Sequence, residues 1–166
     1  RLLEGKVEIG GDRFGDVDAF VDRLGSIGGA NDVTVQAFDA RYVVSRRHLE
    51  RALEVADRER ERGEGIVRDR GVEITLYAAG RRQIDRAMEM GVSRADTAVV
   101  VVDGPGDEEA AAEAVDGLLL EETTLGGYDD DRVRSFYHIG AAELAATDAG
   151  LEALVLERVA LLVVER

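Results

Sequence analysis

The sequence predicts an α/β or α+β domain with a single mixed sheet of about four to five strands, covered by helices and ending in a helical C-terminus. Segments with alternating apolar and polar residues, typical of strands, interleave with segments whose apolar residues recur every three or four positions, typical of helices. The run 98–102 is apolar without alternation, as in a central strand covered on both faces. With 166 residues, 45% of them hydrophobic, the chain fits one domain, residues 1–166, with a true core.

The elements follow from these two periodicities. Strands are predicted at 3–9, 33–38, 72–78 and 98–102. Helices are predicted at 16–24, 46–62, 81–90, 107–120, 130–138, 141–147 and from 151 to the C-terminus. Ser45 and Asp107 are expected to cap two of these helices, because their side-chain oxygens can accept hydrogen bonds from the first turn. The run Gly25 to Gly29, Gly63 and Gly91 are expected to end helices.

The charge pattern is the most unusual property of the sequence. Asp and Glu total 35 against 21 basic residues, for a net charge of -14, and Lys6 is the one lysine. This composition fits a surface adapted to molar salt, where a Debye length of ~3 Å screens repulsion between carboxylates. An acidic protein encoded by a GC-rich genome is the alternative explanation. Salt would also screen long-range attraction to nucleic acid, so an RNA site would need short-range contacts and local arginine clusters.

Several classes of site are disfavoured by what the sequence lacks. There is no cysteine for disulfides or thiolate ligands, and His48 and His138 are the two histidines. No run of ~18 apolar residues and no signal-like segment is present, so we expect a cytoplasmic protein. The Gly104–Gly106 turn lacks a phosphate-loop pattern, and the Asp129–Asp131 cluster is interpreted as a helix cap rather than a cation site. We therefore expect no cofactor, no metal and no catalytic residue.

Two predicted helices begin with cations, although the free N–H groups and dipole of a helix N-terminus favour acids. One begins Ser45-Arg46-Arg47-His48, and the other follows Gly80 with Arg81-Arg82-Gln83. Free N–H groups, a glycine and paired guanidiniums together suit an anion, and phosphate is the obvious one. The alternative is that these arginines pair with nearby carboxylates: Glu50, Asp85 or Asp39.

The C-terminal helix is more apolar than one core-facing stripe requires. From Leu151 to Val164, eleven of fourteen residues are apolar, the exceptions being Glu152, Glu157 and Arg158. Such a helix is either buried on nearly all sides or keeps one face for a partner. At the end of this chain we favour a partner.

One segment reads Ile74-Thr75-Leu76-Tyr77-Ala78-Ala79-Gly80-Arg81-Arg82-Gln83-Ile84 and is followed by Ala87 and Met90-Gly91. It resembles the signature of the TPRKB-like (PRPK-binding) family, although position 79 is Ala where the family often has Ser. Further resemblance lies, in the same order as in the family, at Phe38-Asp39-Ala40, His48-Leu49 with Ala52, Ala98 to Val102, and Leu156 to Leu162.

The resemblance implies a small, non-catalytic subunit of the KEOPS complex, here from a halophilic archaeon, which supports threonylcarbamoyl-adenosine formation in tRNA. Family members dock on the N-terminal lobe of the kinase-like ATPase subunit, and archaeal members are associated with the single-stranded tRNA 3′ end. The implied RNA-binding residues are Arg46, His48, Gly80, Arg81, Arg82, Gln83 and Ile84. From helical spacing we expect the kinase to be bound by Leu151, Leu154, Val155, Val159 and Leu162.

Two other functions remain as alternatives. A pure protein-interaction module would use the arginines for internal ion pairs and would not bind RNA. A small acidic hydrolase would use paired carboxylates in a cleft, but the sequence offers no compact cluster of them. We also expect the apolar C-terminal helix to allow a weak homodimer of the isolated chain.

Overall fold

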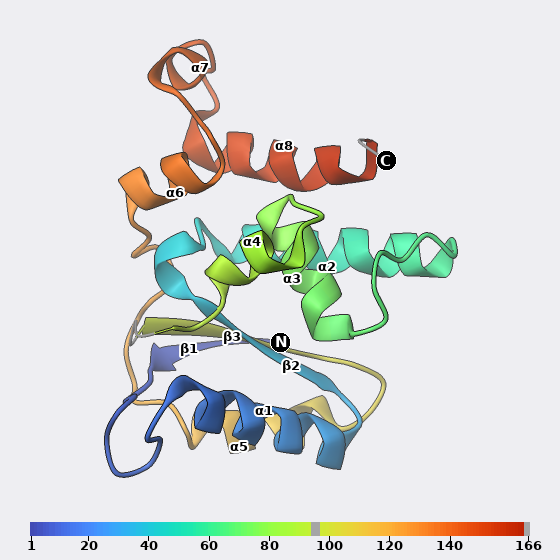
Figure 1. Ribbon diagram of the computed structural model, residues 1–166, viewed down its shortest axis with the longest axis vertical. Coiled ribbons are helices and arrows are strands. Elements are labelled where there is room, and N and C mark those ends of the chain that lie inside the picture. Colours follow the sequence, from blue (N-terminus) through green and yellow to red (C-terminus); the bar gives the residue numbers. More distant parts are fainter. Residues whose placement is uncertain (94–96, 165–166) are drawn as a thin grey trace. The chain divides into compact units, whose positions relative to one another are not determined.

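The computed structural model describes residues 1–93 and 97–164 (Figure 1). In chain order the elements are β1 (Leu2–Lys6), α1 (Val17–Asn31), β2 (Thr34–Asp39), the 3-10 helix η1 (Ala40–Tyr42), α2 (Arg46–Glu61), α3 (Arg70–Ala79), α4 (Ile84–Ala87), the 3-10 helix η2 (Met88–Met90), β3 (Thr97–Asp103), α5 (Glu108–Asp116), α6 (Asp130–Phe136), α7 (Ala141–Ala145) and α8 (Gly150–Val164). They form two compact units. Unit 1 comprises Arg1–Ala40 and Gly91–Leu125, and unit 2 comprises Arg41–Met90 and Gly126–Arg166.

Unit 1 is built on an antiparallel sheet in the order β1-β3-β2. The apolar run of β3 is the central strand, as its lack of alternation predicted, and residues 98–102 are all fully buried. Ala98, Val100 and Val102 pack with apolar residues of α1 and α5, two helices on one face of the sheet (Figure 1). The α+β class and helical C-terminus are confirmed, but the described residues form three strands, all antiparallel, rather than a mixed sheet of four to five.

The missing strand is residues 72–78, which form helix α3 instead. The side chain of Asp69 caps α3 by accepting a hydrogen bond from the Val72 N–H at 2.9 Å, and Gly80 ends it in the left-handed conformation. Every residue from Glu73 to Ala79 is buried. A short helix that is buried on all sides has no polar face and so lacks the helical period. The alternation of apolar residues at 72, 74, 76 and 78 therefore resembles that of a strand.

Helix α1 also differs from the prediction, because it continues through Gly25 to Gly29 and ends at Asn31. Gly28 faces the sheet, and a Cβ there would lie 2.7 Å from the Val33 carbonyl oxygen. A glycine in this helix therefore permits close packing rather than ending the helix. The predicted caps Ser45 and Asp107 are confirmed, each accepting a hydrogen bond from the first turn of its helix.

Unit 2 is helical, and α2, α3 and α8 pack against one another (Figure 1). The irregular segment between α2 and α3 is held by Glu73, a fully buried carboxylate. Glu73 accepts hydrogen bonds from Arg60 Nε at 3.0 Å and from the Ile66 N–H at 2.8 Å. A buried carboxylate needs such partners, and this one fixes where α3 begins.

Candidate functional site

The turn after α3 carries most of the sequence-predicted RNA-binding residues. Gly80 has φ 63° and ψ 33°, and the Arg81 N–H closes the turn by donating to the Leu76 carbonyl at 3.1 Å. A Cβ at Gly80 would lie 2.9 Å from the backbone carbonyl oxygen of Arg158 in α8. Glycine is therefore required here both for the left-handed backbone and for the close approach of the turn to α8.

Arg81 and Arg82 bind helix carbonyls rather than carboxylates. Arg81 Nη2 donates to the Phe136 carbonyl at the end of α6, and its guanidinium lies 4.7 Å from the centroid of the Phe136 ring. Arg82 Nη2 donates to the Leu162 carbonyl near the end of α8 at 3.1 Å. Carbonyls at helix C-termini are free and carry the negative end of the dipole, so cations are favourable there. Arg81 and Arg82 therefore do not place positive charge at the N-terminus of a long helix. Helix α4 has four residues, and the two guanidiniums bind the C-terminal ends of α6 and α8 instead.

The two arginines at the start of α2 differ in their contacts. Arg47 Nη1 lies 2.8 Å from Glu54 Oε1, and this ion pair raises the pKa of Arg47 and lowers that of Glu54. Glu54 thus replaces the carboxylates expected to pair with the arginines. Arg46 is exposed and has no hydrogen-bond or ion-pair partner within residues 1–93 and 97–164. Arg46 is therefore the cation at this helix start that can reach a ligand without breaking an existing contact.

His48 is fully buried, so the expectation that it contacts RNA is wrong. Its Nδ1 accepts a hydrogen bond from the Val44 N–H at 3.4 Å, and its Nε2 lies 2.8 Å from the Ala78 carbonyl, which identifies the Nε2–H tautomer. The Tyr137 hydroxyl donates to the same carbonyl at 2.6 Å. Burial lowers the pKa of His48 to about 4 and raises that of Tyr137. His48 is thus a neutral clamp that joins α2 to the end of α3.

The surface of the turn after α3 consists of the side chains that face away from these contacts. Arg82, Gln83 and Ile84 are exposed, while Gly80 and Arg81 are half-buried. Ile84 is 46% exposed, and Met88 four residues later is 37% exposed. The start of α2 lies at the end of α3, because His48 of α2 contacts the Ala78 carbonyl. We therefore group Arg46 of α2 with Gly80–Ile84 and call them the α3-turn surface. It offers cations, an amide and an apolar side chain, which are the groups that hold single-stranded nucleic acid.

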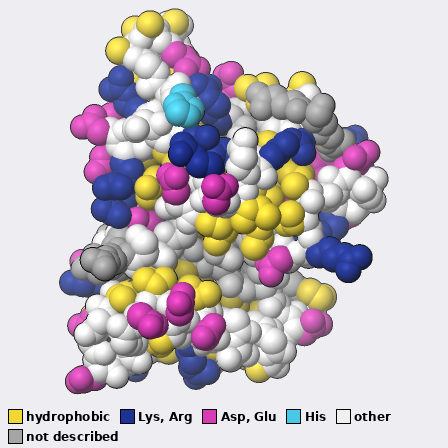
Figure 2. Space-filling model, viewed as in Figure 1, with side chains coloured by type: hydrophobic (Ala, Val, Ile, Leu, Met, Phe, Trp, Pro, Cys, Tyr) yellow, Lys and Arg dark blue, Asp and Glu magenta, His cyan; other side chains and the backbone are white. Residues whose placement is uncertain are grey.

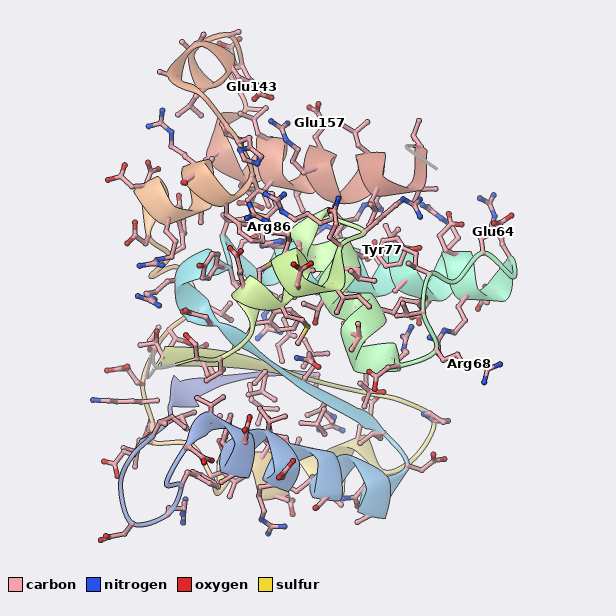
Figure 3. The ribbon with its side chains drawn as sticks, in the orientation of Figure 1. Glu64, Arg68, Tyr77, Arg86, Glu143 and Glu157 are labelled. Carbon is pink, nitrogen blue, oxygen red and sulfur yellow. The ribbon has the colours of Figure 1, made fainter. Side chains whose placement is uncertain are left out.

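The five residues expected to bind the kinase are core residues of unit 2. Their exposure ranges from 0% to 8%, and α8 packs them towards α2 and α3: Leu151, Leu154, Val155, Val159 and Leu162. These five side chains leave no surface for a partner, so the face of α8 that was expected to bind the kinase is the buried one. The opposite face is still apolar and partly exposed: Ala153, Leu156, Ala160, Val163 and Val164. We call this second set the outer face of α8; the exposed Glu157 lies on the same side of the helix (Figure 3).

A cavity of 230 Å³ adjoins the α3 turn, and two of the basic residues that line it were not predicted. Gly80 and Arg81 line it together with Arg158 of α8 and His138, which follows α6. His138 is exposed. Figure 2 shows basic side chains gathered on one face of the molecule. No sequence motif unites these residues, but His138 has a left-handed φ of 55°, which is uncommon for any residue other than glycine.

Charge divides unevenly between the two units. Unit 1 has 17 acidic and five basic residues, a net charge of -12, whereas unit 2 has 18 acidic and 16 basic residues, a net charge of -2. The α3-turn surface and the cavity both belong to the nearly neutral unit 2. A polyanion is therefore repelled far less by the surroundings of these residues than by the chain as a whole.

Within the described residues, carboxylates cap helices and pair with arginines. Asp129 caps α6, with Oδ1 accepting a hydrogen bond from the Arg132 N–H at 3.1 Å. No group of three or more His, Asp or Glu side chains there converges on a common point. Arg47 and Arg158 lower the pKa of Glu54 and Glu143, because a neighbouring cation stabilises the ionised carboxylate. No helix of the described chain is long and apolar enough to span a membrane.

Comparison with protein families identifies a relationship. A protein-family model described as "Kinase binding protein CGI-121" matches residues 17–162. The match runs from α1 to α8 and so passes through both compact units. A search of curated proteins found no match.

Proposed function

The chain belongs to the kinase binding protein CGI-121 family, and on that premise we propose that it is a non-catalytic KEOPS subunit that binds the kinase-like ATPase subunit and the tRNA 3′ end. In this role it supports threonylcarbamoyl-adenosine formation without turning over a substrate of its own. The family match across both units supports treating residues 1–166 as one KEOPS small-subunit domain. The acidic, lysine-poor composition supports a place in the cytoplasm of a halophilic archaeon.

One observation carries the kinase-binding part of the proposal: the outer face of α8 remains apolar after five other apolar residues of the helix are buried. Val164 is 76% exposed, and Leu156 and Val163 are partly exposed on the same face. A helix needs one apolar stripe to join its own core, so a second stripe is explained by a protein partner. We therefore assign the kinase to the outer face of α8 instead of the face chosen from spacing.

The RNA-binding part rests on the α3-turn surface. Arg46 and Arg82 supply guanidiniums for phosphates, Gln83 supplies an amide for a base edge, and Ile84 supplies an apolar support for a base. Short-range contacts of this kind persist in high salt better than long-range attraction does. A single-stranded end suits the surface because its bases are free to leave the stack and contact side chains.

The bonds of Arg81 and Arg82 to helix carbonyls favour the competing function, an interaction module without RNA binding. Titration of the purified chain with tRNA in molar potassium chloride, with the 3′ CCA end present or removed, separates the two. Binding that is lost with the CCA end supports the proposal. Absence of binding to either tRNA leaves the kinase as the partner and assigns these arginines to structure. Binding that is equal for both tRNAs contradicts recognition of the 3′ end.

A further inference from the structure

The cavity beside the α3 turn is lined by basic side chains and by no acidic one. The residues that line it include Arg81, His138 and Arg158 and no Asp or Glu, although the sequence contains 35 acidic residues. Gly80, Tyr137 and Leu161 complete most of the wall. The lining comes from the α3 turn, the α6–α7 connection and α8, so three separate segments bring two arginines and a histidine to one place. Such convergence indicates a site for an anion.

Arg81 is held in place but is not saturated. Its ring contact with Phe136 and its Nη2 bond to the Phe136 carbonyl fix the plane of the guanidinium. A guanidinium has five N–H groups, and the buried Nε of Arg81 has no hydrogen-bond acceptor in the described parts of the chain. Buried donors are normally paired, but Arg81 retains an unused donor in addition to its bond to Phe136.

Arg158 is saturated, and its main partner is an internal carboxylate. Its Nη1 and Nη2 donate to the two oxygens of Glu143 at 2.9 and 2.7 Å, and its Nε donates to the Tyr137 carbonyl at 3.3 Å. Glu143 belongs to α7, a five-residue helix that has no buried residue. The carboxylate that Arg158 binds therefore belongs to a helix with little buried surface. An incoming anion can replace this carboxylate at little cost in packing.

We propose that this cavity is a phosphate-binding site and that Glu143 is the internal anion that a phosphate group displaces from Arg158. Arg81 provides the fixed donors, Arg158 provides a fork once Glu143 has left, and exposed His138 provides a third polar contact. Displacement also frees α7, because the Glu143–Arg158 pair is its side-chain anchor to α8. The site shares Gly80 and Arg81 with the α3-turn surface, so the assignment of RNA as the source of the phosphate rests on the proposed function.

Orthophosphate is the probe for the test, added to the full chain in potassium chloride at constant ionic strength. The readout is the NMR signal of the His138 imidazole, and buried His48 is the internal reference for an intact fold. We expect phosphate to shift the His138 signal and leave His48 in place. Glu143→Gln should tighten phosphate binding by about two- to fivefold, the range for losing one exposed ion-pair competitor. Glu157→Gln, an exposed carboxylate that does not line the cavity, is the control with the same change in charge.

Three results overturn the proposal: an unmoved His138 signal in both wild type and Glu143→Gln, an equal effect of Glu143→Gln and Glu157→Gln, or full phosphate affinity in Arg81→Gln. Addition of tRNA then identifies the source of the phosphate. Competition between tRNA and orthophosphate at His138 identifies the RNA as the source. If tRNA does not change the shift that phosphate causes at His138, the cavity binds free phosphate. In that case Gly80 and Arg81 do not belong to the proposed RNA site. Failure of the site and failure of RNA binding are thereby distinguished.

Discussion

Replacing Gly80 by alanine should destabilise the chain by much more than the backbone conformation alone requires. Gly80 has φ 63°, and a left-handed backbone costs an L-residue roughly 1–2 kcal/mol. The new Cβ would also lie 2.9 Å from the Arg158 carbonyl oxygen and 3.2 Å from its carbonyl carbon, both backbone atoms of α8. Relieving such overpacking typically costs roughly another 1–3 kcal/mol. The total loss in the free energy of unfolding should therefore be about 2–5 kcal/mol.

Gly63→Ala is the matched control for this substitution. Gly63 has φ 75° after the end of α2, but a Cβ there would meet nothing within 4 Å. Its loss should be the conformational term alone, about 1–2 kcal/mol. Urea unfolding in molar potassium chloride measures both variants, and the difference between them isolates the packing of the α3 turn on α8. Equal losses for the two variants would refute the close approach of Gly80 to α8.

Three further predictions concern pH, RNA and salt. Burial lowers the pKa of His48 to about 4, so the unfolded chain binds a proton on His48 more readily than the folded chain does. The free energy of unfolding should therefore fall by up to about 3 kcal/mol as the pH drops from about 6.5 to 4. The His48→Gln variant should lack this contribution to the pH dependence. Arg82→Gln should weaken tRNA binding about threefold or more in a filter-binding assay, whereas Arg23→Gln on α1, with the same change in charge, should not; equal effects would assign the loss to net charge. Lowering the salt concentration should speed amide hydrogen exchange in unit 1 before unit 2, because unit 1 carries a net charge of -12; simultaneous exchange in both units would contradict this.

Local signals in the sequence predicted much of the fold. The apolar run of β3 and the capping residues Ser45 and Asp107 act through neighbouring residues, and each was placed correctly. Helix α3 was missed because burial on every side removes the period by which a helix is recognised. The extent of α1 was missed because the role of Gly28 depends on contact with Val33, which composition does not report.

The candidate sites were less predictable because they depend on tertiary contacts. Spacing showed that α8 has too many apolar residues for one stripe, but which stripe is buried is decided by α2 and α3. Composition likewise suggested that Arg81 and Arg82 were anomalous, and only the structure places their guanidiniums at the ends of α6 and α8. His138 and Arg158 could not be linked to Gly80 from the sequence, since more than fifty residues separate Gly80 from His138.

The most direct test of the account is the affinity of the kinase-like ATPase subunit for Leu156→Glu, measured by calorimetry in molar potassium chloride. Leu156 lies on the outer face of α8 and is partly exposed, so the variant should fold while placing a charge in the proposed interface. Leu120→Glu, at a leucine of unit 1 that is 47% exposed, is the matched control. We predict that Leu156→Glu loses about tenfold or more in affinity while Leu120→Glu keeps the wild-type value. Unchanged kinase binding by a folded Leu156→Glu would contradict docking through the outer face of α8.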